Sequence, residues 1–214
     1  MKQIIIWGAS GHAMVIADII RLRGEYRLDG FLDSLNPQRH HTLFDGVEIL
    51  GGEEQLEELQ NKGVKHLIIG FGNCEARLKF AELAKSKGFK LTSAIHPSAI
   101  IASNVAIGSG TVVAAGAVIN SGTHIGENAI INTSSSVDHE CVIGDGAHIC
   151  PGVHLAGKVT VGRGTWVGIG SCVIDHISIG NATLIGAGSV VAKNIPDNVV
   201  AYGNPAKIVR KHEK

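Results

Sequence analysis

An aliphatic residue stands at every sixth position of this chain from Ile101 to Val191, sixteen times without an interruption. Aliphatic residues fill about one position in three or four of an ordinary domain, so chance does not produce such a run. An uninterrupted short repeat is typical of a solenoid, in which each turn of the chain stacks on the one before it. The sequence therefore predicts a hexapeptide-repeat β-solenoid over this region.

A second period gives the shape of each turn. An aliphatic residue followed by glycine recurs every 18 residues, at Ile107, Ile125, Ile143, Val161 and Ile179. Eighteen residues are three hexapeptides, so each turn is expected to have three flat faces, as in a triangular parallel β-helix. Small residues precede the aliphatic ones by two positions and fit inside the corners: Thr111, Ala117, Thr123, Ala129, Ser135, Cys141 and Ala147. Five such coils, each rising about 4.8 Å, form a column about 24 Å tall.

Residues 1–92 follow a different pattern. An apolar run from Gln3 to Trp7, a glycine-containing turn and a helical spacing that ends at Gly24 read as strand, turn and helix. A strand near Leu28 to Leu32 follows, and further elements are expected at 53–61 (helix), 66–71 (strand) and 74–87 (helix), with a polar loop at 36–45. Strands that alternate with helices predict a small Rossmann-like α/β domain. We therefore divide the chain into an α/β domain (1–92), a β-helix (93–195) and a C-terminal tail (196–214).

The charge balance narrows the class of partner. Nineteen basic and 19 acidic residues, with a pI near 7.2, give no overall field to attract nucleic acid or an anionic membrane. No apolar run reaches transmembrane length, and none of the four cysteines forms a Cys-x-x-Cys pair. We expect a cytoplasmic protein that binds small molecules and copies of itself.

The turn Gly8-Ala9-Ser10-Gly11-His12 is a moderate nucleotide signal. A dinucleotide fingerprint has glycines where Ser10 and Ala13 stand, so a nicotinamide cofactor is not expected. The start of a helix still offers free amides and a favourable dipole to an anion, and Asp33 can accept hydrogen bonds from a ribose or a base. The alternative is structural: the glycines make a tight turn and Asp33 caps a strand.

His139 is the candidate for chemistry. Because Val137 points inward, His139 is expected at a corner of the column, and Gly157 stands 18 residues later at the same corner of the next coil. A residue without a side chain beside an imidazole leaves room for a thioester, whose carbonyl oxygen can accept from the Gly157 amide. Glu140 or Asp138 can orient the ring. A histidine that titrates near neutrality suits a general base, although a lone histidine on a solenoid is otherwise a solvated surface residue.

The block from Asn132 to Gly170, with its Asp-His-Glu-Cys box at 138–141, and the turn at 8–12 resemble the nucleotide-sugar N-acetyltransferases that act on bacillosamine and perosamine precursors. The resemblance covers nearly the whole chain and implies a left-handed β-helix with acetyl-CoA as cosubstrate. It also implies site residues. His139 corresponds to the general base and Glu140 to its acidic neighbour, while His148, Gly157 and Gly168 belong to the acetyl-CoA site. Gly8, Ser10, Gly11, His12 and Asp33 correspond to the nucleotide-sugar site, where Ser34 replaces a second acidic residue of some relatives.

The function that follows is transfer of acetyl from acetyl-CoA to the 4-amino group of a nucleotide-linked sugar for glycan or O-antigen biosynthesis, with a UDP-4-amino-4,6-dideoxy sugar favoured. The transfer is expected to be direct, with His139 as base and Gly157 as oxyanion donor.

His139 and His148 lie nine residues apart and are expected on opposite sides of the prism. They can share a site only across an interface, which predicts a homotrimer. Lys193 and Lys207 can meet CoA phosphates, or the basic tail can simply cap the open edge of the column.

Three other functions stay open on the sequence. Sialic acid O-acetyltransferases share much of the pattern. A metal-dependent hydratase of the carbonic anhydrase type also uses a trimeric β-helix, but the spacings of His139, His148, His154 and His176 do not stack ligands at one corner, so no metal is expected. A non-catalytic solenoid would leave the nucleotide-like turn and the pairing of His139 with Gly157 unexplained.

Overall fold

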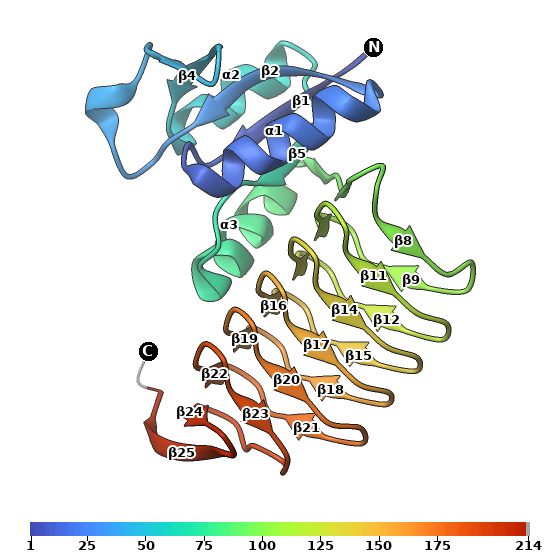
Figure 1. Cartoon of the computed structure of the whole chain (residues 1–214). Helices are drawn as coiled ribbons and strands as arrows, with labels where there is room; N and C mark the ends of the chain where they lie inside the picture. Colours follow the sequence, from blue (N-terminus) through green and yellow to red (C-terminus); the bar gives the residue numbers. More distant parts are fainter. Residues whose placement is uncertain (213–214) are drawn as a thin grey trace.

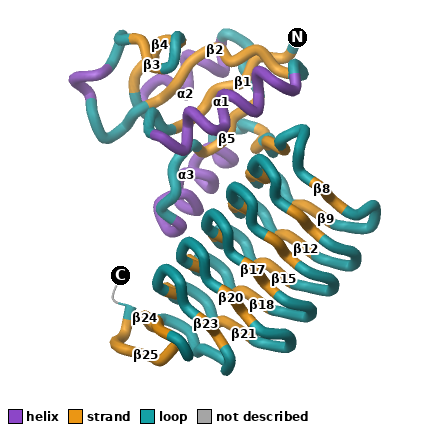
Figure 2. The backbone as a smooth tube through the Cα atoms, in the orientation of Figure 1, coloured by secondary structure: helices purple, strands orange, loops and turns teal. Residues whose placement is uncertain are grey.

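The computed structural model describes residues 1–212, with an α/β domain lying against the first coils of a triangular column (Figures 1 and 2). The α/β domain holds one sheet of strand order β3-β4-β2-β1-β5-β6. Its strands are β1 (Lys2–Trp7), β2 (Tyr26–Leu32), β3 (Leu43–Phe44), β4 (Val47–Gly51), β5 (His66–Ile69) and β6 (Lys90–Leu91). Its helices are α1 (Gly11–Arg23), α2 (Leu56–Asn61) and α3 (Cys74–Ser86), with 3-10 turns at Pro37–Arg39 and Glu53–Gln55. No helix within residues 1–212 is long and apolar enough to cross a membrane.

Strand β1 is the centre of this sheet because its apolar run is buried on both faces. It pairs in parallel with β2 and β5, and α1 covers one face while α2 and α3 cover the other. The α1 helix ends at Gly24, whose φ of +65° gives the left-handed turn that glycine makes without strain. Val112 and Ile130 of the column pack into the same core as α1, so the two parts of the chain share buried apolar contacts.

One segment differs from the sequence expectation. The region 36–45, expected as a polar loop, contains a 3-10 turn, and β3 within it pairs antiparallel with β4, a strand that was not predicted. The connection is Asp45-Gly46, with φ of +49° and +77°. Two consecutive positive φ values are typical of the tight turn that favours Asp-Gly in a hairpin.

The column consists of two-residue strands on three faces. The first face holds β7 (Ala94–Ile95), β10 (Val112–Val113), β13 (Ile130–Ile131), β16 (His148–Ile149), β19 (Trp166–Val167) and β22 (Leu184–Ile185). The second holds β8 (Ile100–Ile101), β11 (Val118–Ile119), β14 (Ser136–Val137), β17 (His154–Leu155), β20 (Cys172–Val173) and β23 (Val190–Val191). The third holds β9 (Ala106–Ile107), β12 (His124–Ile125), β15 (Val142–Ile143), β18 (Thr160–Val161) and β21 (Ser178–Ile179).

The register agrees with the 18-residue period. Each strand pairs in parallel with the one 18 residues later, as in Val112 with Ile130 and Ile130 with His148. The second residue of each strand points inward, and the small residues at the corners are buried too. Thr111 shows how a polar residue fits there, because its hydroxyl donates to the Gly126 carbonyl at 2.8 Å.

The C-terminal tail forms a hairpin on the last coil. Strand β24 (Val199–Gly203) pairs in parallel with β22, and β25 (Ala206–Lys211) pairs antiparallel with β24. The open edge of the first face is thereby covered, as the capping alternative for the tail expects. Lys207 lies on β25, and Lys193 lies exposed just after β23.

Arg77 of α3 joins the two parts of the chain. Its side chain is only 1% exposed, and its guanidinium donates to the carbonyls of Gly72 (2.7 Å), Asn128 (2.8 Å) and Gly146 (2.7 Å). Gly72 belongs to the α/β domain, whereas Asn128 and Gly146 belong to successive coils. Burial lowers the pKa of Arg77, because the protein interior disfavours its charge.

We expect Arg77→Met to lower the free energy of unfolding by at least about 3 kcal/mol, because hydrogen bonds from a charged group are lost and buried carbonyls are left unsatisfied. Urea unfolding measures this loss. The matched control is Arg163→Met, which removes the exposed ion pair with Glu82 (3.2 Å) and should change stability by about 1 kcal/mol or less. Equal losses in the two variants would contradict the assigned role of Arg77.

Candidate functional site

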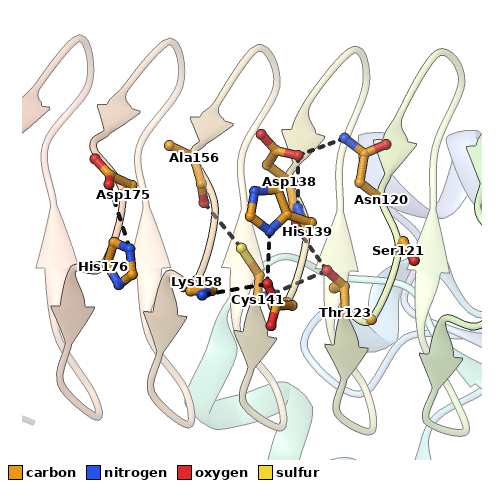
Figure 3. A network of polar contacts seen from close by, with 12 residues as sticks. Asn120, Ser121, Thr123, Asp138, His139, Cys141, Ala156, Lys158, Asp175 and His176 are labelled. Carbon is orange, nitrogen blue, oxygen red and sulfur yellow. Dashed lines mark hydrogen bonds and ion pairs between the residues drawn. The ribbon is translucent and has the colours of Figure 1, made fainter.

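His139 lies in the turn between the second and third faces of the column, directly after β14 (Figure 3). The turn is held by Asp138, whose Oδ1 accepts from the His139 amide at 2.7 Å and from Asn120 Nδ2 at 2.8 Å. These two hydrogen bonds, with that from Asn120 the larger, lower the pKa of the Asp138 carboxyl. Asp138 therefore fixes the backbone at this corner.

The imidazole of His139 contacts the other acidic neighbour. Its Nδ1 lies 3.1 Å from Glu140 Oε2, and Lys158 Nζ lies 3.7 Å from the same oxygen. The His139 side chain is 53% exposed, and Nε2 makes no hydrogen bond within residues 1–212. A ring whose Nδ1 donates to a carboxylate presents a free lone pair at Nε2. The sequence left open which acidic residue orients the ring, and only Glu140 contacts it through a side-chain hydrogen bond.

Gly157 lies directly beneath this ring, as the 18-residue spacing predicts. A Cβ added to Gly157 would lie 2.6 Å from both Cε1 and Nε2 of His139, so any side chain at this position would displace the ring. The carbonyl of Gly157 accepts from the His176 amide at 3.0 Å, while its own amide donates to no acceptor in residues 1–212. An amide without an acceptor beside an imidazole supplies the hydrogen-bond donor and the base that an acyl transfer uses.

Cys141 is part of the core and not of the reactive corner. Its side chain is fully buried, and Sγ donates to the Ala156 carbonyl at 3.2 Å. Burial raises the pKa of the thiol, so the thiolate nucleophile is disfavoured.

His148 lies on the first face of the column, away from His139. It is buried, and its ring packs edge-on against Trp166 with 4.3 Å between ring centres. Burial, with a smaller effect from Arg77, lowers the pKa of His148 to about 3, so the ring is neutral at pH 7. Asn132 Nδ2 lies 3.0 Å from Nε2 and donates to it, which assigns the ring proton to Nδ1.

A groove of about 370 Å³ runs from His148 along the corner between the first and second faces. Its lining includes Asn132, His148, Cys150, Pro151, Trp166, Gly168, Ile169, Leu184, Ile185, Gly186 and Ala187. Two of the residues assigned to the acetyl-CoA site, His148 and Gly168, therefore share one groove. Gly157, Lys193 and Lys207 do not line it.

A second cavity, of about 360 Å³, lies at the carboxyl ends of β1 and β2. Gly8, Ser10 and Asp33 line it, as the nucleotide prediction requires. It is also lined by Trp7, Ala9, Leu32, Ser34, Leu35, Asn36, Arg39, Phe71, Asn73, Ala76 and Phe80. Arg39 was not expected at this cavity, because its place beside the glycine turn depends on tertiary contacts of the loop at 36–45.

Gly11 and His12 lie outside the lining of this cavity. The ring of His12 instead faces His148, with 6.3 Å between ring centres, and burial followed by the charge of Arg77 lowers the pKa of His12 to about 4. Its Nε2 is buried without a hydrogen-bond partner. The structure thus places His12 between the α/β domain and the column, and not beside the cavity to which the sequence analysis assigned it.

Asp33 lines the cavity, but its carboxylate is occupied by the chain itself. Oδ1 accepts from the amides of Leu35 (3.0 Å) and Asn36 (3.1 Å). Oδ2 accepts from Asn36 Nδ2 (3.1 Å) and from Arg39 Nη1 (3.2 Å). A ribose or base that donates a hydrogen bond to Asp33, as the sequence predicts, would compete with these four donors.

Within residues 1–212, no three side chains of the His, Cys, Asp or Glu type gather closely enough to hold a metal ion. The four histidines considered for a hydratase therefore form no such group: His139, His148, His154 and His176.

Comparison with solved structures identifies the family. PerB of Caulobacter crescentus, in complex with CoA and GDP-perosamine, is 38% identical to this chain, with a TM-score of 0.93 and 98% of each chain covered. A perosamine N-acetyltransferase variant from the same bacterium matches with the same identity and TM-score. The chain belongs to this N-acetyltransferase family.

Other members of the family are consistent with this assignment. The acetyltransferase domain of PglB from Neisseria gonorrhoeae FA1090 is 33% identical to this chain, with a TM-score of 0.90 over 98% of this chain and 100% of that one. The UDP-N-acetylbacillosamine N-acetyltransferase of Bacillus subtilis (strain 168) is 38% identical over 113 residues, 52% of this chain and half the length of that relative. Residues 3–84 match the PglD N-terminal domain, and residues 122–157 match the bacterial transferase hexapeptide (six repeats).

The comparisons confirm the predicted family and fold class, a Rossmann-like α/β domain followed by a left-handed parallel β-helix. The roles of individual residues in this N-acetyltransferase and its exact domain boundaries stay predictions.

Proposed function

We propose that this chain transfers the acetyl group of acetyl-CoA to the 4-amino group of a nucleotide-linked amino sugar. The observation that carries the proposal is the His139 imidazole lying over Gly157, whose amide has no acceptor within residues 1–212. The relatives support the choice of substrates. PerB was solved with CoA and GDP-perosamine, the PglB domain was solved with acetyl coenzyme A, and the Bacillus subtilis relative acts on UDP-N-acetylbacillosamine according to its name.

The corner supplies the groups that the reaction needs. The sugar amine attacks the thioester carbonyl, and His139 Nε2 accepts the proton that the nitrogen loses as the C–N bond forms. The negative charge on the carbonyl oxygen is stabilised by the Gly157 amide. Collapse of the tetrahedral intermediate breaks the C–S bond, and the CoA thiolate takes up the proton from the imidazolium. Glu140 stabilises that imidazolium through Nδ1, and no covalent enzyme intermediate forms.

The groove at His148 and Gly168 is the proposed site of the CoA pantetheine arm. Its lining is mostly apolar, and Asn132 provides an amide at one end. Because the pKa of His148 is low, its ring is neutral at pH 7. A neutral ring is compatible with the uncharged amide groups of the pantetheine arm. Lys193 and Lys207 remain proposed contacts of the CoA phosphates, beside the observed role of the tail as a cap.

We further propose a homotrimer. His139 lies between the second and third faces, whereas the groove lies between the first and second, so one chain does not bring the two together. A neighbouring copy with its His139 corner against this groove completes a site. Ile100 and Ile169, which are large, apolar and exposed, are consistent with a surface that is covered by another copy.

Sedimentation equilibrium is expected to give three times the 22.4 kDa mass of the chain. Mixing His139→Ala chains with chains that carry Ile169→Asp in the groove should restore part of the activity, because some mixed sites combine an intact corner with an intact groove. A stable monomer that keeps full activity would overturn the trimer.

A cytoplasmic location is part of the proposal. Cys74, Cys141 and Cys150 are buried free thiols, and such thiols persist in a reducing compartment.

The deciding experiment measures acetyl-CoA turnover with a panel of acceptors. The release of the CoA thiol is the quantity that is measured. The panel contains UDP- and GDP-linked 4-amino-4,6-dideoxy sugars, the free amino sugars and sialic acid. We expect turnover with a nucleotide-linked amine, the UDP form favoured, and little with a free sugar. Acetylation of sialic acid hydroxyls, with no use of nucleotide-linked amines, would replace the proposal with the O-acetyltransferase alternative.

A further inference from the structure

Arg39 lies at the cavity of the α/β domain and bridges two of its walls. It ends the 3-10 turn Pro37–Arg39, and its Nη1 donates to the Ala9 carbonyl at 2.8 Å and to Asp33 Oδ2 at 3.2 Å. Its guanidinium carbon lies 5.2 Å from the centre of the Phe44 ring, which supports it from another side. These contacts hold a cation directly beside the glycine turn.

The guanidinium keeps donors for a ligand. Nη1 makes both of the hydrogen bonds above, while Nε and Nη2 bond no acceptor within residues 1–212. The side chain is 40% exposed and lines the cavity. Because a guanidinium stays charged at all working pH values and presents its donors as a planar fork, it suits a phosphate oxygen pair.

The rest of the cavity fits a nucleoside joined to that phosphate. Trp7, Phe71 and Phe80 provide aromatic wall, with Phe80 edge-on to both other rings at 4.7 and 5.4 Å. Ser10 begins α1 without a side-chain cap, and the first turn of α1 contains no acidic residue that would compete with an anion. An apolar aromatic wall next to a fixed cation is complementary to a base and its phosphates.

Asp33 has a different part in this arrangement. It is 6% exposed, and its two oxygens already accept hydrogen bonds from four donors of Leu35, Asn36 and Arg39. These bonds shape the loop after β2 and hold the guanidinium in place. The Asp33 carboxylate therefore acts by holding Arg39 and the loop in place, and this role requires no contact between Asp33 and the ligand.

We propose that Arg39 binds the diphosphate of the nucleotide-sugar substrate and that Asp33 is the residue that positions it. This inference rests on the proposed function, because it assigns a residue to that same substrate. It changes the sequence expectation, in which Asp33 was the polar contact and the loop at 36–45 had no role.

The test compares ligands with and without phosphate. Dissociation constants of UDP and uridine, and of GDP and guanosine, are measured by calorimetry for the wild-type chain and for Arg39→Met. We expect Arg39→Met to weaken binding of the diphosphate at least about tenfold, since a charge-assisted hydrogen bond is lost, and to leave the nucleoside within about twofold. Arg39→Lys should recover only part of the loss. The matched control is Arg27→Met, which removes an exposed ion pair with Asp29 in the same domain.

A double-mutant cycle tests the part of Asp33. If Asp33 acts by holding Arg39, Asp33→Ala lowers the preference for diphosphate over nucleoside, and adding it to Arg39→Met lowers that preference no further. Additive losses would show that Asp33 affects diphosphate binding independently of Arg39 and would overturn its role as a positioning residue.

The outcomes separate the two proposals. If the wild-type chain binds a nucleoside diphosphate and Arg39→Met binds it equally well, the assignment of Arg39 is wrong while the proposed function stands. If the wild-type chain binds neither UDP nor GDP and acetylates no nucleotide-linked amine, the proposed function itself fails.

Discussion

Replacement of His139 by alanine is expected to lower kcat by about 10²–10⁴-fold, the usual effect of losing a general base. The fold should persist, because the side chain is half exposed and does not belong to the aliphatic core. The KM for acetyl-CoA should change little, because the pantetheine arm is proposed to lie in the groove at His148, whose lining does not include His139. Steady-state kinetics with a nucleotide-linked amino sugar, together with a thermal melt, measures both effects.

His124→Ala is the matched control. His124 is another exposed histidine of the column, on the third face, and its Nδ1 contacts only the Gly122 carbonyl at 3.2 Å. Its loss should leave kcat unchanged. If the His139 variant keeps more than half of the wild-type kcat, the assignment of the base is wrong.

The column could be predicted from the sequence because its geometry is one-dimensional. A two-residue strand repeats every six residues, so the position of any residue on the prism follows from its number alone. The proximity of His139 and Gly157 required only the 18-residue period, and the structure places the ring over that glycine.

The α/β domain could be predicted less completely, because local pattern does not say which elements pair. Strand β4 was missed because a short apolar run such as Val47–Gly51 does not identify a strand by periodicity alone, and its pairing with β3 depends on the Asp45-Gly46 turn. The Asp-Gly pair was visible in the sequence and is a strong hairpin signal.

The positions of His12, Asp33 and Arg39 depend on tertiary contacts that no period encodes. His12 lies on α1, and whether it faces the cavity or the column is decided by how the two parts of the chain pack around Arg77. Asp33 and Arg39 lie in an irregular loop, where hydrogen bonds between residues three to six positions apart fix the side chains. Sequence reasoning identified Asp33 as polar and well placed, but could not show that its carboxylate is already occupied.

Gly157→Ala is expected to lower kcat by about 10²-fold or more without unfolding the chain. The backbone of Gly157 is not in the left-handed region, so alanine fits its conformation, and its amide is retained. The added methyl group would lie 2.6 Å from Cε1 and Nε2 of His139, and the exposed ring must swing away. A displacement of about 1 Å in a reacting group can cost about 10²-fold in rate.

The same substitution in the His139→Ala chain distinguishes an effect on the imidazole ring from an effect at the Gly157 amide. Because alanine keeps the amide, a loss that arises only from displacing the imidazole should disappear when the imidazole is already gone. We therefore expect the double variant to match His139→Ala in kcat, with an unchanged melting temperature. A further large loss in the double variant would mean that the methyl group obstructs the thioester itself. Wild-type kcat in the single variant would show that His139 does not act from the position above Gly157.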